Sequence, residues 1–246
     1  MNEEEKAIVI ALPFAGGSQF SYKVLERNVS FPFEWFSVEI PGRGTRINEI
    51  TIPDILSVCE DIYQQILPIV RNYSFMFFGH GMGALLGYEL TRMLIENDEP
   101  VPLCLFFTGQ SGPSVERTQS ISRSDRDIFW KEVRKLGGLS DALFNDKELI
   151  DLFEPTIRAD YRALEQYSYT PLEEPFEIPI FLRSGSEDVT DWHKMEAWQE
   201  ETAYPLNFQV YQGNHFFIFS HIHELLEDIE DAYETAMNMT FEFIRR

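Results

Sequence analysis

The sequence reads FFGHGMGA at residues 77–84, and this stretch decides the fold. A short apolar run at 75–78 leads into the glycines, and a helix-forming run at 84–90 follows them. A strand, a tight glycine turn and a helix in this order are typical of a nucleophile elbow, G-x-S-x-G, which lifts a serine hydroxyl above the sheet. Gly81 stands at the serine position. The sequence therefore predicts the backbone around a nucleophile without the nucleophile itself.

The same residues also fit a dinucleotide fingerprint, G-x-G-x-x-G/A, at Gly79, Gly81 and Ala84. That motif needs a carboxylate at the end of the next strand to hold a ribose. The next apolar run, 101–107, ends in Thr-Gly-Gln, and the turn follows the third predicted strand instead of the first. These two observations favour the elbow, while a tight turn without chemistry stays open.

Length and charge limit the function classes. The chain has 246 residues, enough for one α/β domain over 1–246 with a full core. Its net charge of −21 argues against nucleic acid or an anionic membrane as a partner. Cys59 and Cys104 lie in apolar patterns and are expected as buried free thiols, which is typical of a reducing compartment. The first residues lack a signal core, and no apolar run approaches a membrane span of about 20 residues, so we expect a cytoplasmic protein. We also expect it to be a monomer.

Strand-like and helix-like runs alternate, which predicts a mainly parallel sheet with helices on both faces. The expected strands are 7–12, 35–40, 75–78, 103–107, 178–182 and 208–211, and the clearest helices are 53–70 and 222–243. The alternation stops between about 114 and 175, where two helical patterns, 125–136 and 147–167, flank Gly137-Gly138. We expect this stretch, 114–175, to be a helical lid insertion over the site. A structural helix pair that shields the sheet edge is the alternative.

Two further residues follow strands in the second half of the chain. Asp188 comes shortly after the strand at 178–182, and His215 comes after the strand at 208–211. The chain order of position 81, acid and histidine is that of an α/β hydrolase. Alone, Asp188 would suit a helix cap and His215 a surface loop. Together they predict a site at the carboxyl edge of the sheet.

Two backbone N–H groups are candidates for an oxyanion hole. In this fold one donor comes from the loop after the first strand and one from the residue after the nucleophile, which gives Phe14 and Met82. Ser111 and Ser114, past the next strand, are weak substitute nucleophiles because nothing aims them at these donors. The five histidines have no further ligand at a usual spacing, so we expect no metal.

At this point the chain resembles the type II, stand-alone thioesterases that accompany nonribosomal peptide and polyketide synthases. The resemblance covers nearly the whole chain and rests on its motifs: LPFAGG at 12–17, PGRG at 41–44, MGA at 82–84, LGGL at 136–139, FEPTIRADY at 153–161 and GNHFF at 213–217. It implies an α/β-hydrolase fold and hydrolysis of acyl groups from the phosphopantetheine thiol of acyl or peptidyl carrier proteins, without a cofactor of the enzyme's own. It also implies Asp188 as the acid, His215 as the base and position 81 as the nucleophile.

The departures from the family pattern are Gly81, where the family has serine, and Asn214, where glycine is common. Glycine tolerates the strained elbow but cannot form an acyl-enzyme. We therefore expect a severely impaired thioesterase. Three explanations stay open: an engineered change at Gly81, a natural non-catalytic homologue that binds carrier protein or acyl ligand, and hydrolysis by water that His215 activates.

Overall fold

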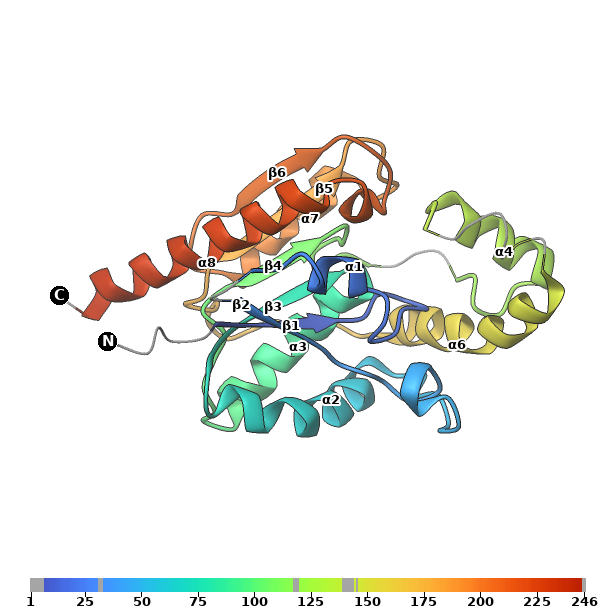
Figure 1. The fold of residues 1–246 in the computed structure, drawn as a ribbon, viewed down its shortest axis with the longest axis horizontal. Coiled ribbons are helices and arrows are strands. Elements are labelled where there is room, and N and C mark those ends of the chain that lie inside the picture. The colour runs from blue at the N-terminus through green and yellow to red at the C-terminus, as the bar shows by residue number, and fades with distance from the viewer. Residues whose placement is uncertain (1–6, 31–32, 117–119, 139–143, 145, 245–246) are drawn as a thin grey trace.

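The structure is a computed structural model that describes residues 7–30, 33–116, 120–138, 144 and 146–244. The amino-terminal stretch in which no signal core was found, 1–6, and Leu139 of the LGGL motif lie outside the described residues. Figure 1 shows the central sheet, helices on both of its faces, and the amino and carboxyl ends on one side of the molecule.

The centre is one six-stranded sheet with the strand order β2-β1-β3-β4-β5-β6, in which every neighbouring pair is parallel. The strands are β1 (Ala7–Leu12), β2 (Phe33–Ser37), β3 (Ser74–His80), β4 (Leu105–Thr108), β5 (Ile180–Gly185) and β6 (Asn207–Tyr211). The mainly parallel α/β-hydrolase sheet predicted from the sequence is confirmed. The strand order reverses between β1 and β3, and in such sheets ligands bind at the carboxyl ends beside this reversal.

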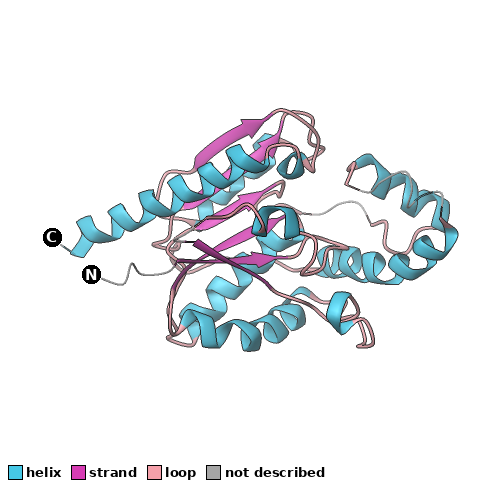
Figure 2. Ribbon diagram, viewed as in Figure 1, coloured by secondary structure: helices cyan, strands magenta, loops and turns pink. Residues whose placement is uncertain are grey.

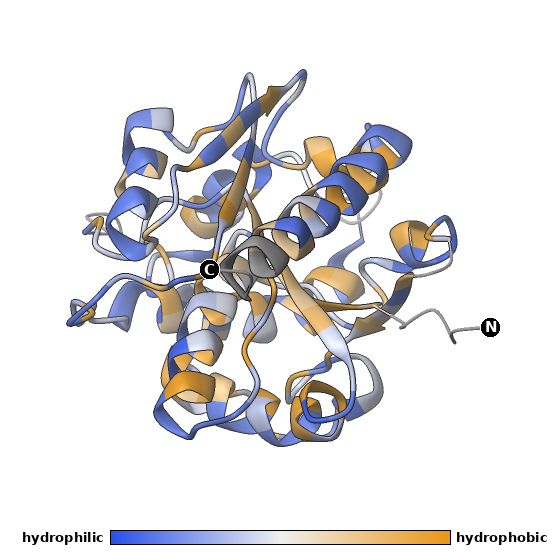
Figure 3. Cartoon of the chain, turned by 90° about the vertical axis from the view of Figure 1, so that its left-hand side faces the viewer, coloured by the Kyte–Doolittle hydropathy of each residue, from blue (hydrophilic) through white to orange (hydrophobic). Residues whose placement is uncertain are grey.

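Helices cover both faces of the sheet (Figure 2). On one face α2 (Ile55–Val70) and α3 (Met82–Glu96) pack against side chains such as Phe77, and on the other α1 (Lys23–Glu26) and α8 (Ile222–Ile244) pack against side chains such as Phe78. Successive strand residues point to opposite faces, so a strand covered on both sides is apolar throughout. Figure 3 shows this apolar interior. The remaining short helices are η1 (Gly44–Arg46), α7 (Trp192–Met195), η2 (Glu196–Glu201) and η3 (Phe217–Phe219).

Two further helices, α4 (Arg126–Lys135) and α6 (Lys147–Gln166), lie beyond the carboxyl ends of the strands, opposite the chain termini (Figure 1). They correspond to the helical patterns that interrupt the alternation. They share a small apolar cluster of their own, centred on Phe129, Trp130 and Ile157. The Asp146 side chain begins α6 by accepting hydrogen bonds from the next backbone N–H groups, as an N-cap does.

The bounds of the second strand are wrong in the sequence prediction, which placed it at 35–40. β2 runs from Phe33 to Ser37 because it is an edge strand that, among the described residues, pairs with β1 alone, and their register ends at Ala11 and Ser37. The apolar residues Val38 and Ile40 are buried, but they lie in the loop that follows. Their hydrophobicity reports burial and not strand pairing.

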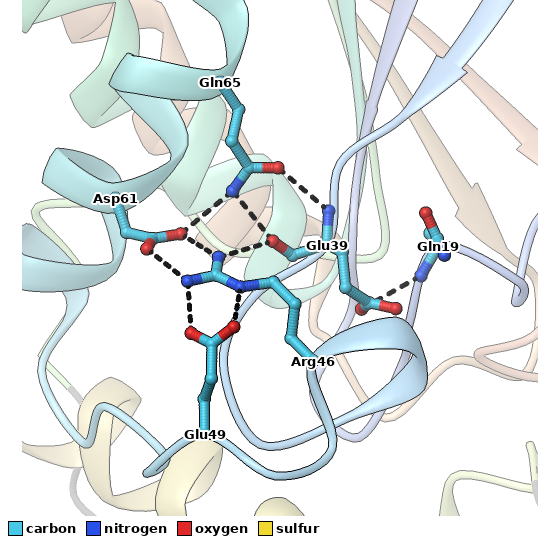
Figure 4. Close-up of polar contacts among 6 residues, drawn as sticks. All are labelled: Gln19, Glu39, Arg46, Glu49, Asp61 and Gln65. Carbon is cyan, nitrogen blue, oxygen red and sulfur yellow. Dashed lines mark hydrogen bonds and ion pairs between the residues drawn. The ribbon is translucent and has the colours of Figure 1, made fainter.

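An ion-pair network fixes the loop after β2 (Figure 4). The Arg46 guanidinium donates to both oxygens of Asp61, at 2.5 and 2.8 Å, and to both oxygens of Glu49, at 2.9 and 2.6 Å. It also donates to the backbone carbonyl of Glu39. The pKa of the Glu39 carboxyl is raised, because burial outweighs the opposing hydrogen bonds from backbone N–H groups, first that of Gln19. The network ties the loop after β2 to α2 and to the loop after β1.

Candidate active site

The turn between β3 and α3 has the geometry of a strained elbow. Gly81 lies between the strand and the helix with φ +52° and ψ −118°, a region that side-chain-bearing residues rarely adopt. A Cβ at Gly79 would lie 2.4 Å from the carbonyl carbon of Gly83, and one at Gly83 would lie 2.3 Å from the carbonyl oxygen of Leu12. The flanking glycines are therefore required by close packing of the helix against the strands.

Position 81 has room for a side chain, and that side chain would point at His215. A Cβ placed on Gly81 would lie 3.5 Å from His215 Nε2, in ordinary contact, with no backbone atom in the way. The Gly81 N–H donates to the carbonyl of Thr108 at 2.9 Å, which fixes the turn. A hydroxyl one bond beyond this Cβ would be within hydrogen-bond reach of the imidazole.

The structure brings Asp188 and His215 together as well. His215 Nδ1 lies 3.0 Å from both carboxylate oxygens of Asp188, whose side chain is fully buried. Asp188 also accepts the N–H of Thr190 at 2.9 Å. An ionised carboxylate can only accept, so the proton of a neutral His215 sits on Nδ1 and Nε2 presents its lone pair to position 81. This is the arrangement of an acid–base pair poised beside a nucleophile position.

A second histidine, His80, lies beneath this pair; from its place between the elbow glycines the sequence suggests only that it packs below the turn, with no part in the chemistry. It is completely buried, its Nδ1 lies 2.8 Å from the Thr108 hydroxyl, and its ring centroid lies 4.5 Å from that of His215. Burial lowers the pKa of His80 well below its usual range, and the charge of His215 acts in the same direction. Its Nε2 has no hydrogen-bond partner among the described residues. A neutral ring here supports His215 without placing a second positive charge under it.

A cavity of about 280 Å³ opens in front of Gly81 and His215. Its walls are mainly apolar. Val133 comes from α4, and four more wall residues, Phe153, Ile157, Tyr161 and Leu164, come from α6. The other apolar wall residues are Phe14, Met82, Leu136 and Phe216. An adjoining cavity of about 520 Å³ shares Gln110, Leu136, Tyr161 and Leu164 with the first. Its other walls include the polar residues Ser111, Glu116, Glu132, Lys135 and Lys194. The site thus combines an apolar chamber with a more polar approach.

The two predicted oxyanion donors differ in their surroundings. Met82 is the first residue of α3, and the first N–H groups of a helix have no partner within it, so its N–H is not used by the helix itself. Phe14 lies in the loop after β1, where its carbonyl accepts the Gly17 N–H at 2.7 Å. The hydroxyl of the neighbouring Tyr22 donates to the Leu12 carbonyl at 3.0 Å, at the end of β1 where this loop begins.

Other site types find no support in the part of the chain that the structure describes. No group of three or more His, Cys, Asp or Glu side chains there is arranged to hold a metal ion. Within the same residues, no helix is long and apolar enough to cross a membrane. Cys59 and Cys104 are free and buried, as the sequence predicted.

Known proteins resemble this chain in sequence and in fold. The thioesterase domain family matches the chain over residues 7–233. The chain is 30% identical to the gramicidin S biosynthesis protein GrsT of Aneurinibacillus migulanus, over 92% of this chain and 89% of that protein. Among solved structures it is similar to ClbQ from the colibactin NRPS/PKS pathway, with a TM-score of 0.89, 26% identity, and coverage of 96% of this chain and 100% of that one. It is also similar to the type II thioesterase BorB from the borrelidin biosynthetic cluster, with a TM-score of 0.84, 28% identity, and 94% of each chain covered.

Proposed function

This chain belongs to the thioesterase family, and we propose that it hydrolyses acyl thioesters held on the phosphopantetheine arm of acyl or peptidyl carrier proteins during nonribosomal peptide or polyketide synthesis. Similar proteins come from such pathways, including a type II thioesterase and a protein of gramicidin S synthesis. The observation that carries the proposal is the direction in which a side chain at position 81 would point. A side chain there points at His215 Nε2, with a Cβ-to-nitrogen distance of 3.5 Å, and the buried Asp188 holds the other side of the ring.

With serine at position 81 the proposed reaction has two steps. The serine hydroxyl attacks the thioester carbonyl while His215 Nε2 takes the hydroxyl proton, and the backbone N–H groups of Met82 and Phe14 stabilise the resulting oxyanion. The C–S bond then breaks, and His215 returns the proton to the leaving thiol. Water, deprotonated by the same nitrogen, next attacks the acyl-serine ester; the C–O bond to the serine breaks, His215 returns the proton to the serine oxygen, and the acyl group leaves as a carboxylic acid. Asp188 orients the imidazole and stabilises its charged form.

With Gly81 the covalent route is closed, so we infer that this form of the site is severely impaired. In a serine protease, loss of the nucleophile lowers kcat by about 2 × 10⁶ and leaves a residual rate of about 10³ to 10⁴ over water. His215 retains its geometry and can still deprotonate a water bound in the space beside Gly81. The same chamber can also hold an acyl group without cleaving it, which is the binding alternative.

We infer that the segment 114–175, with α4 and α6, acts as the lid of the site within one domain, 1–246. Its helices supply apolar cavity walls such as Val133, Phe153 and Ile157, which suit an acyl chain. We further infer a cytoplasmic monomer that needs no cofactor of its own. The net charge of −21 disfavours nucleic acid and anionic membranes as partners.

Restoring the serine tests the proposal. We expect Gly81→Ser to raise kcat for an acyl-pantetheine thioester, and for the same acyl group on a carrier protein, by roughly 10⁴-fold or more. The matched control adds His215→Ala to Gly81→Ser, which removes the base and should return the rate to that of the starting chain. A folded Gly81→Ser variant that binds the acylated carrier protein but does not hydrolyse it would overturn the proposal in favour of a binding module.

A further inference from the structure

A buried ion pair joins the lid to the loops around the site. Arg43 Nη1 and Nη2 each donate to one carboxylate oxygen of Asp160, both at 2.6 Å, and the two residues are 5% and 1% exposed. Two parallel hydrogen bonds between a guanidinium and a carboxylate fix the relative orientation of both groups. Arg43 lies in the loop after β2, and Asp160 lies on α6, so the pair links the sheet to the lid helix.

The same two side chains hold the loop after β1. Asp160 Oδ2 accepts the Gly16 N–H at 2.7 Å, and Arg43 Nη1 donates to the Gly17 carbonyl at 3.1 Å. The turn they grip is closed by the Gly17 N–H and the Phe14 carbonyl, so its position determines where Phe14 lies. One charged pair thereby fixes the loop that carries a proposed oxyanion donor.

The lid helix makes a close fit at this point. Gly16 has φ +80°, and a Cβ there would lie 2.8 Å from Ile157 Cγ1, one turn before Asp160 on α6. The Thr156 hydroxyl donates to the Gly42 carbonyl at 3.1 Å. The loop after β1 thus receives contacts from α6 that exist only while this helix is seated on the sheet.

Stability alone is a weak reason for such a pair. Removing a guanidinium and a carboxylate from water costs free energy that their attraction often only offsets, and apolar residues can replace a buried pair with little loss. Such a pair does give directional, bidentate fixation. Its hydrogen bonds here end on the glycine turn beside the cavity instead of on the sheet.

We infer that Arg43 and Asp160 are positioning residues: their pair aligns the loop after β1 with position 81, and it does so only when α6 is seated, so that closure of the lid completes the oxyanion hole. The inference rests on the proposed function. Arg43 and Asp160 touch neither the nucleophile position nor His215 in the contacts described above, and they act through the loop at Phe14.

The test uses Asp160→Asn in the Gly81→Ser chain, with Glu165→Gln as the matched control. Glu165 is another carboxylate on α6, but it accepts hydrogen bonds from Ile121 and Ser122, away from the loop after β1. Asparagine keeps the size of Asp160 but provides one acceptor oxygen in place of two. We expect kcat to fall roughly 10- to 100-fold, which is at most the loss seen when an oxyanion donor is removed. KM should change less than about threefold. Glu165→Gln should leave both within about twofold.

Analogue binding separates positioning from mere loosening of the lid. An alkyl boronic acid, which forms a tetrahedral adduct with the introduced serine, should lose affinity in Asp160→Asn by about the same factor as kcat/KM. A neutral acyl-pantetheine amide should bind as before. Equal losses for both ligands, or an unchanged kcat, would overturn the inference. Arg43→Lys, which keeps the charge but not the bidentate contact, should fall between Asp160→Asn and the unsubstituted pair.

Hydrogen exchange distinguishes failure of this inference from failure of the proposed function. In the Gly81 chain, Asp160→Asn should speed exchange of the Gly16 amide by about tenfold or more, and Glu165→Gln should not. An inactive Gly81→Ser chain with this exchange pattern would refute the proposed function and the assigned catalytic positioning together. It would leave intact the finding that the Arg43–Asp160 pair holds the loop after β1. Equal exchange at Gly16 in both variants would show that the Arg43–Asp160 pair does not hold this loop, whatever the activity.

Discussion

The turn at Gly81 lies beside His215 at one cavity, with Asp188 on the far side of the imidazole, and different physical requirements fix these residues. Gly79 and Gly83 are needed because the helix packs against the strands at distances that no Cβ allows. Asp188 and His215 satisfy no comparable need of the fold. They are a buried carboxylate and an imidazole whose hydrogen bonds are mostly to each other.

This difference shows that packing of the fold accounts for the turn at 79–83, whereas it does not account for Asp188 and His215. The elbow backbone follows from the close packing at Gly79 and Gly83 and does not depend on a side chain at position 81. A buried carboxylate is costly unless it is paired; Asp188 is paired with His215, and the imidazole faces position 81. The chain therefore keeps an acid–base pair directed at a residue that has no side chain.

The largest expected effect tests the acid–base side. In the Gly81→Ser chain, Asp188→Asn should lower kcat by about 10⁴, because an amide in place of the carboxylate favours the wrong tautomer of His215. Steady-state hydrolysis of an acyl-pantetheine thioester measures this. A drop of less than tenfold would show that the carboxylate does not orient the imidazole.

The next effect tests the elbow side through stability. Gly79→Ala places a methyl group 2.4 Å from backbone atoms of α3 and should lower the free energy of unfolding by about 3 kcal/mol. Gly81→Ser meets only His215 at an ordinary distance, so its cost of about 1–2 kcal/mol comes from the positive φ alone. Urea unfolding of both variants gives the two values. The comparison fails if Gly81→Ser is the more damaging change.

The smallest effect concerns the buried histidine between the two sides. The unfolded chain binds a proton at His80 near the ordinary pKa of about 6.5, whereas the folded chain does so only at a much lower pH, first because of burial and then because of His215. Protons therefore favour the unfolded state, and His80 lowers the free energy of unfolding below about pH 6.5 by up to about 1.4 kcal/mol per pH unit.

Replacing this histidine should remove its share of the pH dependence. We expect His80→Gln to lose less stability than the parent between pH 6.5 and 5, measured by urea unfolding at several pH values. His193→Gln, at an exposed position, is the control and should match the parent. Identical slopes for His80→Gln and the parent would show that the ring takes up a proton freely in the folded protein.

Much of the fold was readable from the sequence because its signals are local. The elbow glycines, the apolar strand runs and the order of Gly81, Asp188 and His215 each depend on a few neighbouring residues, and the structure brings those three residues together. The site roles remain predictions until the variants are made. The bounds of β2 were wrong because pairing with β1 ends that strand, and the apolar run continues past it.

The long-range contacts could not be read in the same way. Arg43 and Asp160 stand in motifs that the sequence shows plainly, but they are 117 positions apart, and nothing local pairs them. The position of His80 beneath His215 depends on how β3, β4 and the loop after β6 meet in space. Sequence patterns report burial and turns, whereas such partners follow from the assembled topology.

The central claim is that a hydroxyl at position 81 would be activated by His215. Reaction with a fluorophosphonate, followed by intact-mass and peptide analysis, tests it directly. We predict that Gly81→Ser takes up one label at position 81, that the starting chain takes up none, and that adding His215→Ala abolishes labelling. An unlabelled but folded Gly81→Ser chain, or a label on another residue such as Ser111, would contradict the account.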